Sequence, residues 1–291
     1  MGATLQLGPV GIWSLQFRTG DRGQAREAIS ELEELDFGTL WIPESGTKAI
    51  LGVASELLEA STKIVIASGI LNIWMHEPDE VLAAVRQFDR DHPERFLLGL
   101  GVSHASLVEP TGRQYTRPRS MMVDFLDALD AATPPIEPSE RVLAALGPRM
   151  LELARDRALG AHPYCVPVQH TAFARETLGT GPVLAPELKA VLIEDATTAR
   201  EVARAHLEHY LEMPNYTNNL LRFGFTEDDF GNGGSDRLVD SLVAWGSPEV
   251  VASRVRDHHA AGADHVCINV IASDTSKFPI DEWRAIAGAL H

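Results

Sequence analysis

A histidine at the end of an apolar run is the first residue in this chain with a clear chemical capacity. Residues 95–102, "RFLLGLGV", have the composition of a buried strand, and His104 follows closely. The run supplies two glycines of a dinucleotide-binding G-x-G-x-x-G turn, but His104 stands where the third would be. Because an imidazole titrates near physiological pH, we interpret His104 as a candidate proton donor or acceptor.

The stretch "AALGP", residues 144–148, predicts a second kind of chemistry, the binding of an anion. Gly147 allows a ligand to come close to the backbone, and Pro148 suits the first position of a helix. The N-terminus of that helix would offer free N–H groups and a positive dipole end to a phosphate. Arg149 would add positive charge there, or would simply be solvated on the helix surface.

The elements that carry these residues alternate along the chain. Eight apolar runs, each followed by apolar residues at helical spacing, favour a closed parallel (β/α)8 barrel over a doubly wound open sheet. In a barrel, functional side chains lie at the carboxyl ends of the strands, where His104 and residues 144–148 fall. The predicted strands are residues 5–13, 39–43, 63–71, 95–102, 141–146, 162–167, 188–194 and 264–271.

One polar segment, residues 213–236, interrupts the alternation between the seventh strand and the late helices. In residues 237–245 the apolar residues again have helical spacing, which predicts a helix there. Such a long connection is either a lid that contributes to a binding surface or a helical hairpin packed outside the barrel. No linker divides the chain, so we predict a single domain over residues 1–291.

The composition narrows the functional classes. Hydrophobic residues make up 45% and charged residues 23% of the 291 residues, which is typical of a soluble globular enzyme. A formal net charge of −16 disfavours nucleic-acid binding, and no apolar run approaches the length of a membrane span. Two cysteines provide no disulfide framework and fit a reducing cytoplasm. The histidines form neither H-E-x-x-H nor H-x-H, so no metal site is expected.

Three stretches resemble the coenzyme F420 (deazaflavin)-dependent branch of the bacterial luciferase-like superfamily. They are "IVIASGILNIW" (64–74), "RFLLGLGVSH" (95–104) and "RVLAALGPRMLELARDRALGAH" (141–162). The resemblance covers essentially the whole chain. It implies a TIM barrel of the luciferase-like type, a homodimer, and an oxidoreductase that transfers a hydride between F420 and a small organic substrate. The alternatives are an FMN-dependent monooxygenase that uses reduced flavin and dioxygen, and a cofactor-binding barrel without turnover.

The resemblance also implies site residues. It places a non-proline cis peptide at Ser68–Gly69, behind the cofactor ring. The implied cofactor contacts are Ser68, Gly69, Ile70, Val102, Ser103, Ala145, Leu146, Gly147 and Arg149. From the loops at the strand ends and from the 213–236 segment, we expect the substrate pocket to include Trp13, Ser45, Trp74, Cys165, Tyr216 and Asn218.

The acid-base residues depart from the family pattern. Sugar-phosphate dehydrogenases of this branch carry an Asp-His pair after the second strand and a Glu after the fourth. Here these positions read Glu44-Ser45 and His104. We therefore expect a substrate other than a sugar phosphate. His104 is the first catalytic candidate, the alternative being that it only hydrogen-bonds the cofactor or the backbone. Glu44 would orient His104 or serve as the partner acid-base group.

Overall fold

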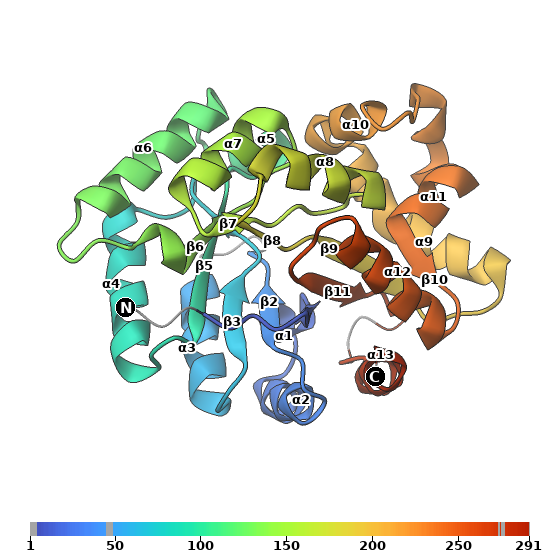
Figure 1. Cartoon of the computed structure of the whole chain (residues 1–291), viewed down its shortest axis with the longest axis horizontal. Helices are drawn as coiled ribbons and strands as arrows, with labels where there is room; N and C mark the ends of the chain where they lie inside the picture. Colours follow the sequence, from blue (N-terminus) through green and yellow to red (C-terminus); the bar gives the residue numbers. More distant parts are fainter. Residues whose placement is uncertain (1–4, 45–48, 273, 275–276, 291) are drawn as a thin grey trace.

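Eleven short strands pair in parallel to form a barrel with helices on its outside (Figure 1). The count refers to a computed structural model that describes residues 5–44, 49–272, 274 and 277–290. The strands are β1 Val10–Trp13, β2 Thr39–Ile42, β3 Val65–Ser68, β4 Leu71–Asn72, β5 Phe96–Gly101, β6 Arg141–Leu143, β7 Gly160–Ala161, β8 Val183–Leu184, β9 Glu187–Val191, β10 Val243–Trp245 and β11 Val266–Val270.

The ring closes through residues 183–191. β8 pairs with β7, and after a short break the same segment continues as β9, which pairs with β11. Across the break, the amide of Glu187 donates to the carbonyl oxygen of Pro163 at 2.9 Å, and the amide of Cys267 donates to that of Pro186 at 3.0 Å. The segment is bonded on both sides, so the predicted barrel is confirmed and the open-sheet alternative is excluded.

The helices begin where capping residues favour them. The Asp21 carboxylate accepts from the amide of Gly23 at 2.8 Å and so caps α2, and the Ser235 hydroxyl caps α11. Pro78 starts α4, and Pro148 starts α7, as predicted for Pro148. The helices are α1 Gln16–Thr19, α2 Arg22–Glu34, α3 Ile50–Ala60, α4 Pro78–Asp91, α5 Ala105–Val108, α6 Pro118–Ala131, α7 Pro148–Arg157, α8 Val168–Leu178, α9 Ala196–Leu211, α10 Pro214–Leu221, α11 Asp236–Leu242, α12 Pro248–Ala260 and α13 Ile280–Leu290. Within the described ranges, every helix is too short or too polar to span a bilayer.

The sixth barrel strand was predicted at the wrong residues. The prediction covered 162–167, but β7 covers Gly160–Ala161 and the following residues form a loop. A Cβ at Gly160 would lie 1.8 Å from the carbonyl oxygen of Val183, so only glycine allows β7 and β8 to approach this closely. Proline residues in 162–167 lack the N–H that a strand ladder needs.

The predicted helix over 237–245 is also wrong at its end. α11 stops at Leu242, and β10 pairs in parallel with β9. A short apolar run is compatible with both the helical and the strand spacing of apolar residues. Here the available edge of β9 pairs with residues 243–245, so they form a strand.

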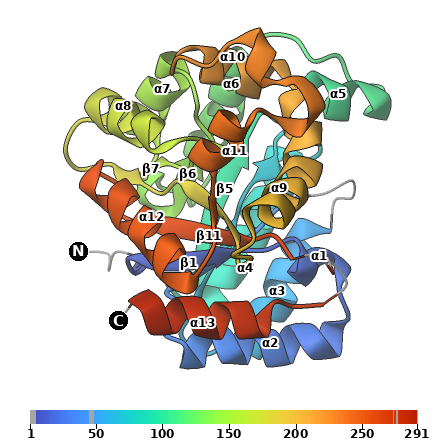
Figure 2. The ribbon, with the colours of Figure 1, turned by 90° about the vertical axis from the view of Figure 1, so that its right-hand side faces the viewer.

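The segment 213–236 is partly helical. It contains α10 and two 3-10 turns, Glu227–Asp229 and Gly231–Gly233. Figure 2 shows α10 at the opposite end of the molecule from α2 and α13. Its position at the strand ends supports the prediction of a binding surface.

Two histidines are held neutral inside the barrel. His162 Nδ1 donates to the carbonyl oxygen of Ala185 at 2.7 Å, and its ring stacks on Trp41 with centroids 4.3 Å apart. His265 Nδ1 donates to the carbonyl oxygen of Gly8 at 2.8 Å, while its Nε2 accepts from Trp41 Nε1 at 3.0 Å. Burial lowers the pKa of both rings to about 4.

Acid is therefore expected to destabilise the protein in a defined window. Between about pH 6.5 and pH 4, the unfolded chain binds protons that the folded His162 and His265 do not. The contribution of these rings to the free energy of unfolding is complete above about pH 6.5 and is lost as the pH falls. Urea titrations at several pH values measure it, and a His162→Gln variant should lose less stability across the window. A flat profile would contradict the prediction.

Candidate active site

A cavity of about 710 Å³ opens at the carboxyl ends of the barrel strands. Its walls come from the residues that follow β1, β2, β3, β5, β6 and β7, together with α10 and the end of α9. This is the face on which barrel enzymes carry out their chemistry.

Most of the predicted site residues line this one cavity. They are Trp13, Glu44, Gly69, Ile70, Val102, Ser103, His104, Ala145, Leu146, Gly147, Tyr216 and Asn218. Four others, Ser68, Trp74, Cys165 and Arg149, do not line it. Ser45 lies outside the described residues.

Of the residues outside the cavity, two brace its walls and a third is a buried thiol. The Ser68 hydroxyl donates to the carbonyl oxygen of Gly99 at 2.9 Å and accepts from its amide at 2.8 Å. Trp74 Nε1 donates to the carbonyl oxygen of Val102 at 2.8 Å, which holds the loop that leads to His104. Cys165 is buried, and burial raises the pKa of its thiol to about 11, so the thiol stays protonated.

A backbone bulge between β3 and β4 forms one wall. The non-proline cis peptide bond is Gly69–Ile70, one residue later than predicted, because the bulge lies between the two strands rather than at the end of β3. Trp13 Nε1 donates to the carbonyl oxygen of Gly69 at 2.9 Å. A Cβ at Gly101 would lie 2.5 Å from the Ile70 side chain, so any larger residue in this strand would force Ile70 to move.

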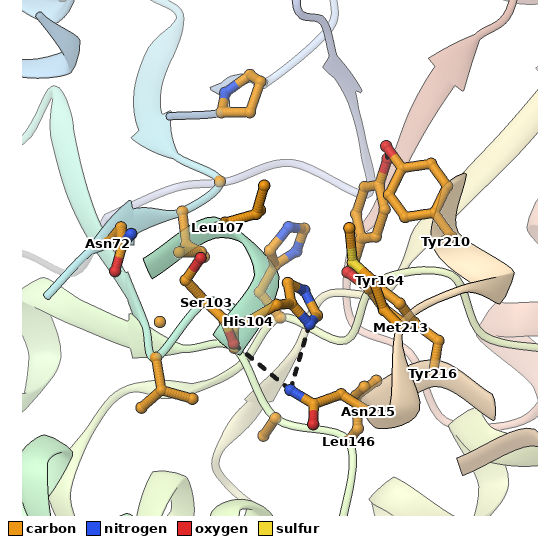
Figure 3. Close-up of a pocket in the computed structure, with 18 of the residues that line it drawn as sticks. Asn72, Ser103, His104, Leu107, Leu146, Tyr164, Tyr210, Met213, Asn215 and Tyr216 are labelled. Carbon is orange, nitrogen blue, oxygen red and sulfur yellow. Dashed lines mark hydrogen bonds between the residues drawn. The ribbon is translucent and has the colours of Figure 1, made fainter. Parts of the chain in front are cut away.

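His104 lies at the N-terminus of α5, opposite α10. Ser103 before it has a left-handed φ of 53°, which turns the chain out of β5. Asn215 of α10 lies with its Nδ2 3.3 Å from His104 Nδ1 and 3.4 Å from the carbonyl oxygen of Ser103, the two dashed lines in Figure 3. Burial, and secondarily the charge of His209, lower the pKa of His104 to about 4. The ring is therefore neutral at neutral pH.

The same amide sets the tautomer of His104. Asn215 directs its NH2 group at the carbonyl oxygen of Ser103, which can only accept. The other amide proton then points at His104 Nδ1, which accepts it, and the ring proton resides on Nε2. His104 is thus a neutral donor through Nε2–H.

Glu44 lines the cavity, but both of its carboxylate oxygens have protein partners. Oε1 lies 2.7 Å from His76 Nε2, and Oε2 accepts from the amide of Asn72 at 2.7 Å. The Glu44 and His76 side chains are 5% and 0% exposed. This arrangement ties the loop after β2 to β4, so we assign Glu44 a positioning role rather than proton transfer.

A cation stands beside Gly147, but it is Arg222 rather than Arg149. Arg149 is exposed on α7. Arg222, at the end of α10, lines the cavity, and its Nη1 lies 3.3 Å from the point that a Cβ of Gly147 would occupy. The predicted anion site at the start of α7 therefore has a guanidinium from the 213–236 segment next to it.

Three of the four tyrosines of the chain form the wall opposite the bulge. Tyr164 follows β7, Tyr210 belongs to the last turn of α9, and Tyr216 belongs to α10 (Figure 3). Their ring centroids lie 5.4 to 6.2 Å apart. The centroid of the Tyr216 ring also lies 4.9 Å from that of the His104 ring. Of the three, only Tyr216 was predicted from the sequence.

Some of the missed residues had a signal in the sequence. Glu187 and Lys189 alternate in an otherwise apolar strand, which places both on one face of β9, inside the barrel. Had the sixth strand been assigned to residues 160–161 rather than 162–167, Tyr164 would have been recognised as a residue of the loop at the strand end. Tyr210 and Arg222 belong to helices, and nothing in their spacing indicates that they face the cavity.

The comparisons with known proteins agree with this architecture. The chain belongs to the luciferase-like monooxygenase family, whose family model matches residues 10–265. None of the curated protein sequences that we compared with the chain matched it.

Solved structures share the fold at low sequence identity. An F420-dependent secondary alcohol dehydrogenase in complex with an F420-acetone adduct superposes with a TM-score of 0.77 at 14% identity, over 97% of this chain and 99% of that one. Coenzyme F420-dependent tetrahydromethanopterin reductase from Methanopyrus kandleri gives 0.75 at 16% identity, over 99% of both chains. The oxygenating constituent of 3,6-diketocamphane monooxygenase from Pseudomonas putida, in complex with FMN, gives 0.69 at 11% identity, over 98% and 96%.

Proposed function

We propose that the protein is an F420-dependent oxidoreductase that exchanges a hydride with a small organic substrate. The observation that carries the proposal is the placement, around one cavity, of the bulge at Gly69–Ile70, the turn that starts α7, and Arg222. Among the structures named above, the two F420-dependent enzymes superpose with TM-scores of 0.77 and 0.75, against 0.69 for the monooxygenase in complex with FMN.

The residues present fit a ring with a phosphorylated side chain. Ile70 and the backbone of Gly69 would support one face of the ring, because the bulge directs them at the cavity. Gly147 leaves the first turn of α7 open, and Arg222 would supply the positive charge that this acidic protein needs for a phosphate. When bound, the deazaflavin would supply or accept the hydride.

The protein's own side chains would stabilise charge on the substrate, exclude water and orient the substrate. His104 presents a neutral Nε2–H, which would stabilise negative charge that develops on a substrate oxygen. The tyrosine wall and the apolar side chains around it exclude water and orient the substrate. Glu44 and His76 hold the strand ends in place.

The second candidate is an FMN-dependent monooxygenase, favoured by the FMN-bound structure among those that share the fold. Titration of the purified protein with F420 and with FMN, followed by fluorescence, separates the two. We expect tighter binding of F420. Binding of FMN without measurable affinity for F420 would overturn the first proposal, and cofactor binding without turnover of any substrate would favour a non-catalytic barrel.

Replacement of Arg222 tests the anion site. Arg222→Ala is expected to weaken cofactor binding by about 10- to 100-fold, because a charge-assisted hydrogen bond is lost. Arg149→Ala, which removes the same side chain from the exposed face of α7, serves as the control and should leave the affinity unchanged. Equal effects of the two changes in a fluorescence titration would place the phosphate elsewhere.

A further inference from the structure

A chain of hydrogen bonds leads from the barrel interior to the cavity wall. It starts at a buried ion pair in β9, where Lys189 Nζ lies 2.8 and 2.9 Å from the two carboxylate oxygens of Glu187. Their side chains are 0% and 1% exposed. Asn269 of β11 donates through Nδ2 to Glu187 Oε1 at 2.9 Å. The pair is neutral as a whole, so it contributes orientation and no net charge.

The direction of each bond in the chain can be assigned. The Glu187 carboxylate only accepts, so Asn269 must present its NH2 group there, and its second proton is directed at Tyr164 Oη, 3.4 Å away. Tyr164 Oη lies 2.9 Å from Tyr210 Oη. Either hydroxyl could donate in this pair; because Asn269 already occupies one lone pair of Tyr164 Oη, we assign Tyr164 as the donor and Tyr210 as the acceptor. The proton of Tyr210 then has no acceptor among the described residues.

The surroundings keep this terminal hydroxyl protonated. Burial raises the pKa of both Tyr164 and Tyr210, so neither phenol ionises at neutral pH. The Lys189 ammonium lies 3.8 Å from the centroid of the Tyr164 ring and 5.0 Å from that of Tyr210. A cation over an aromatic face withdraws electron density from the ring, which makes its hydroxyl a better donor.

We propose that Tyr210 is a substrate-orienting donor and that the cavity selects an uncharged molecule with a carbonyl oxygen. This inference rests on the proposed function, because the carbonyl would be the group that exchanges the hydride. Tyr210 donates from α9 and His104 Nε2 donates from the loop after β5, both into one cavity with apolar walls such as Met213. An anionic ligand is disfavoured beside Tyr210, because Lys189 is already neutralised by Glu187 and the guanidinium of Arg222 lies at Gly147, where the cofactor phosphate is proposed to bind.

The test uses small probes and the protein without cofactor, in an Arg222→Ala background so that benzoate cannot pair with the guanidinium beside Gly147. The probes are acetophenone labelled with ¹³C at the carbonyl, ethylbenzene of similar shape without the oxygen, and benzoate. Calorimetric titration gives the affinities, and difference infrared spectroscopy gives the carbonyl stretching frequency of the bound ketone. We expect acetophenone to bind about 2- to 10-fold more tightly than ethylbenzene, with benzoate the weakest, and a lowered stretching frequency.

Three variants locate the donor. Tyr210→Phe should abolish the preference for acetophenone and raise the stretching frequency. Tyr216→Phe removes the other phenol hydroxyl of the tyrosine wall that could donate; we expect it to retain the preference, and loss of the preference in this variant would assign the donor to Tyr216 and overturn the inference. Asn269→Leu should leave ethylbenzene binding unchanged but raise the stretching frequency, because Asn269 is a positioning residue that acts through Tyr164. Melting temperatures verify that each variant is folded.

Several results would overturn the inference. They are an unchanged preference and frequency in Tyr210→Phe, tighter binding of benzoate than of acetophenone, or no binding of acetophenone. Because the probes are measured without cofactor, failure of the proposed function is recognised separately. If neither F420 nor FMN binds while the preference still depends on Tyr210, the redox proposal fails and the carbonyl subsite stands.

Discussion

A His104→Ala variant is expected to lose about two to three orders of magnitude in kcat while it retains its affinity for the cofactor. Removal of one preorganised donor that faces developing negative charge has a cost of this size in other enzymes. Asn215, itself bonded to the carbonyl oxygen of Ser103, places the ring proton of His104 on Nε2, and His104 lines the cavity. Steady-state kinetics with F420 and an accepted substrate measure the effect.

The control for this variant is His92→Ala. His92 follows α4, where its backbone amide donates a hydrogen bond to the carbonyl oxygen of Phe88. Its loss should leave kcat within about twofold, as is usual for a surface change. If His104→Ala behaves like His92→Ala, His104 is only a contact residue.

The pH dependence gives an independent test of the role of His104. Its pKa is lowered to about 4, so the neutral form is present through the neutral range and protonation begins only in acid. Protonation at Nδ1 would break the contact with Asn215. We expect kcat to stay level from pH 8 down to about 5.5 and to fall as the pH approaches 4, provided the protein remains folded. A fall centred near 6.5 would indicate an unperturbed histidine.

A Glu187→Ala variant is expected to lose about 3–5 kcal/mol in the free energy of unfolding. The change would leave the Lys189 ammonium buried without a partner, and breaking a buried pair in this way is strongly destabilising. Asn269 would also lose its hydrogen-bond acceptor, and the hydrogen bonds from Asn269 to Tyr210 would no longer be oriented. Chemical denaturation at neutral pH measures the loss.

The double variant Glu187→Gln/Lys189→Met provides the matched comparison. It removes both charges at similar volume, and replacement of a buried pair by uncharged groups is often neutral or stabilising. It should therefore recover most of the stability lost in Glu187→Ala. A loss below about 1 kcal/mol in the single variant would show that water reaches Lys189.

Sequence patterns predicted the parts of this site that follow the barrel strands. His104 and Gly147 could be placed because each follows an apolar run, and the ends of parallel strands meet at one face of a barrel. Pro148 identified the helix start for the same local reason. The positions of these residues depend only on short stretches of sequence, in which the composition and the spacing of apolar residues indicate the secondary structure.

The parts that were missed depend on contacts between distant segments. Arg149 and Arg222 both carry guanidinium groups, and only the path of α10 over the strand ends decides which one lies beside Gly147. Tyr210 belongs to a helix that covers the outside of the barrel, but its last turn passes the rim and faces the cavity. The strand at 160–161 was missed because close packing against β8, rather than any apolar period, selects Gly160.

The cavity wall built by the end of α9 and by α10 also has a consequence for how this protein can change. One contiguous peptide, residues 209–222, supplies the donor Tyr210, the Asn215 that sets the proton on His104, and the guanidinium of Arg222. The barrel strands do not depend on it for closure. Exchange of this single peptide between relatives would therefore transfer substrate preference as a unit, so new specificities can evolve here without rebuilding the scaffold.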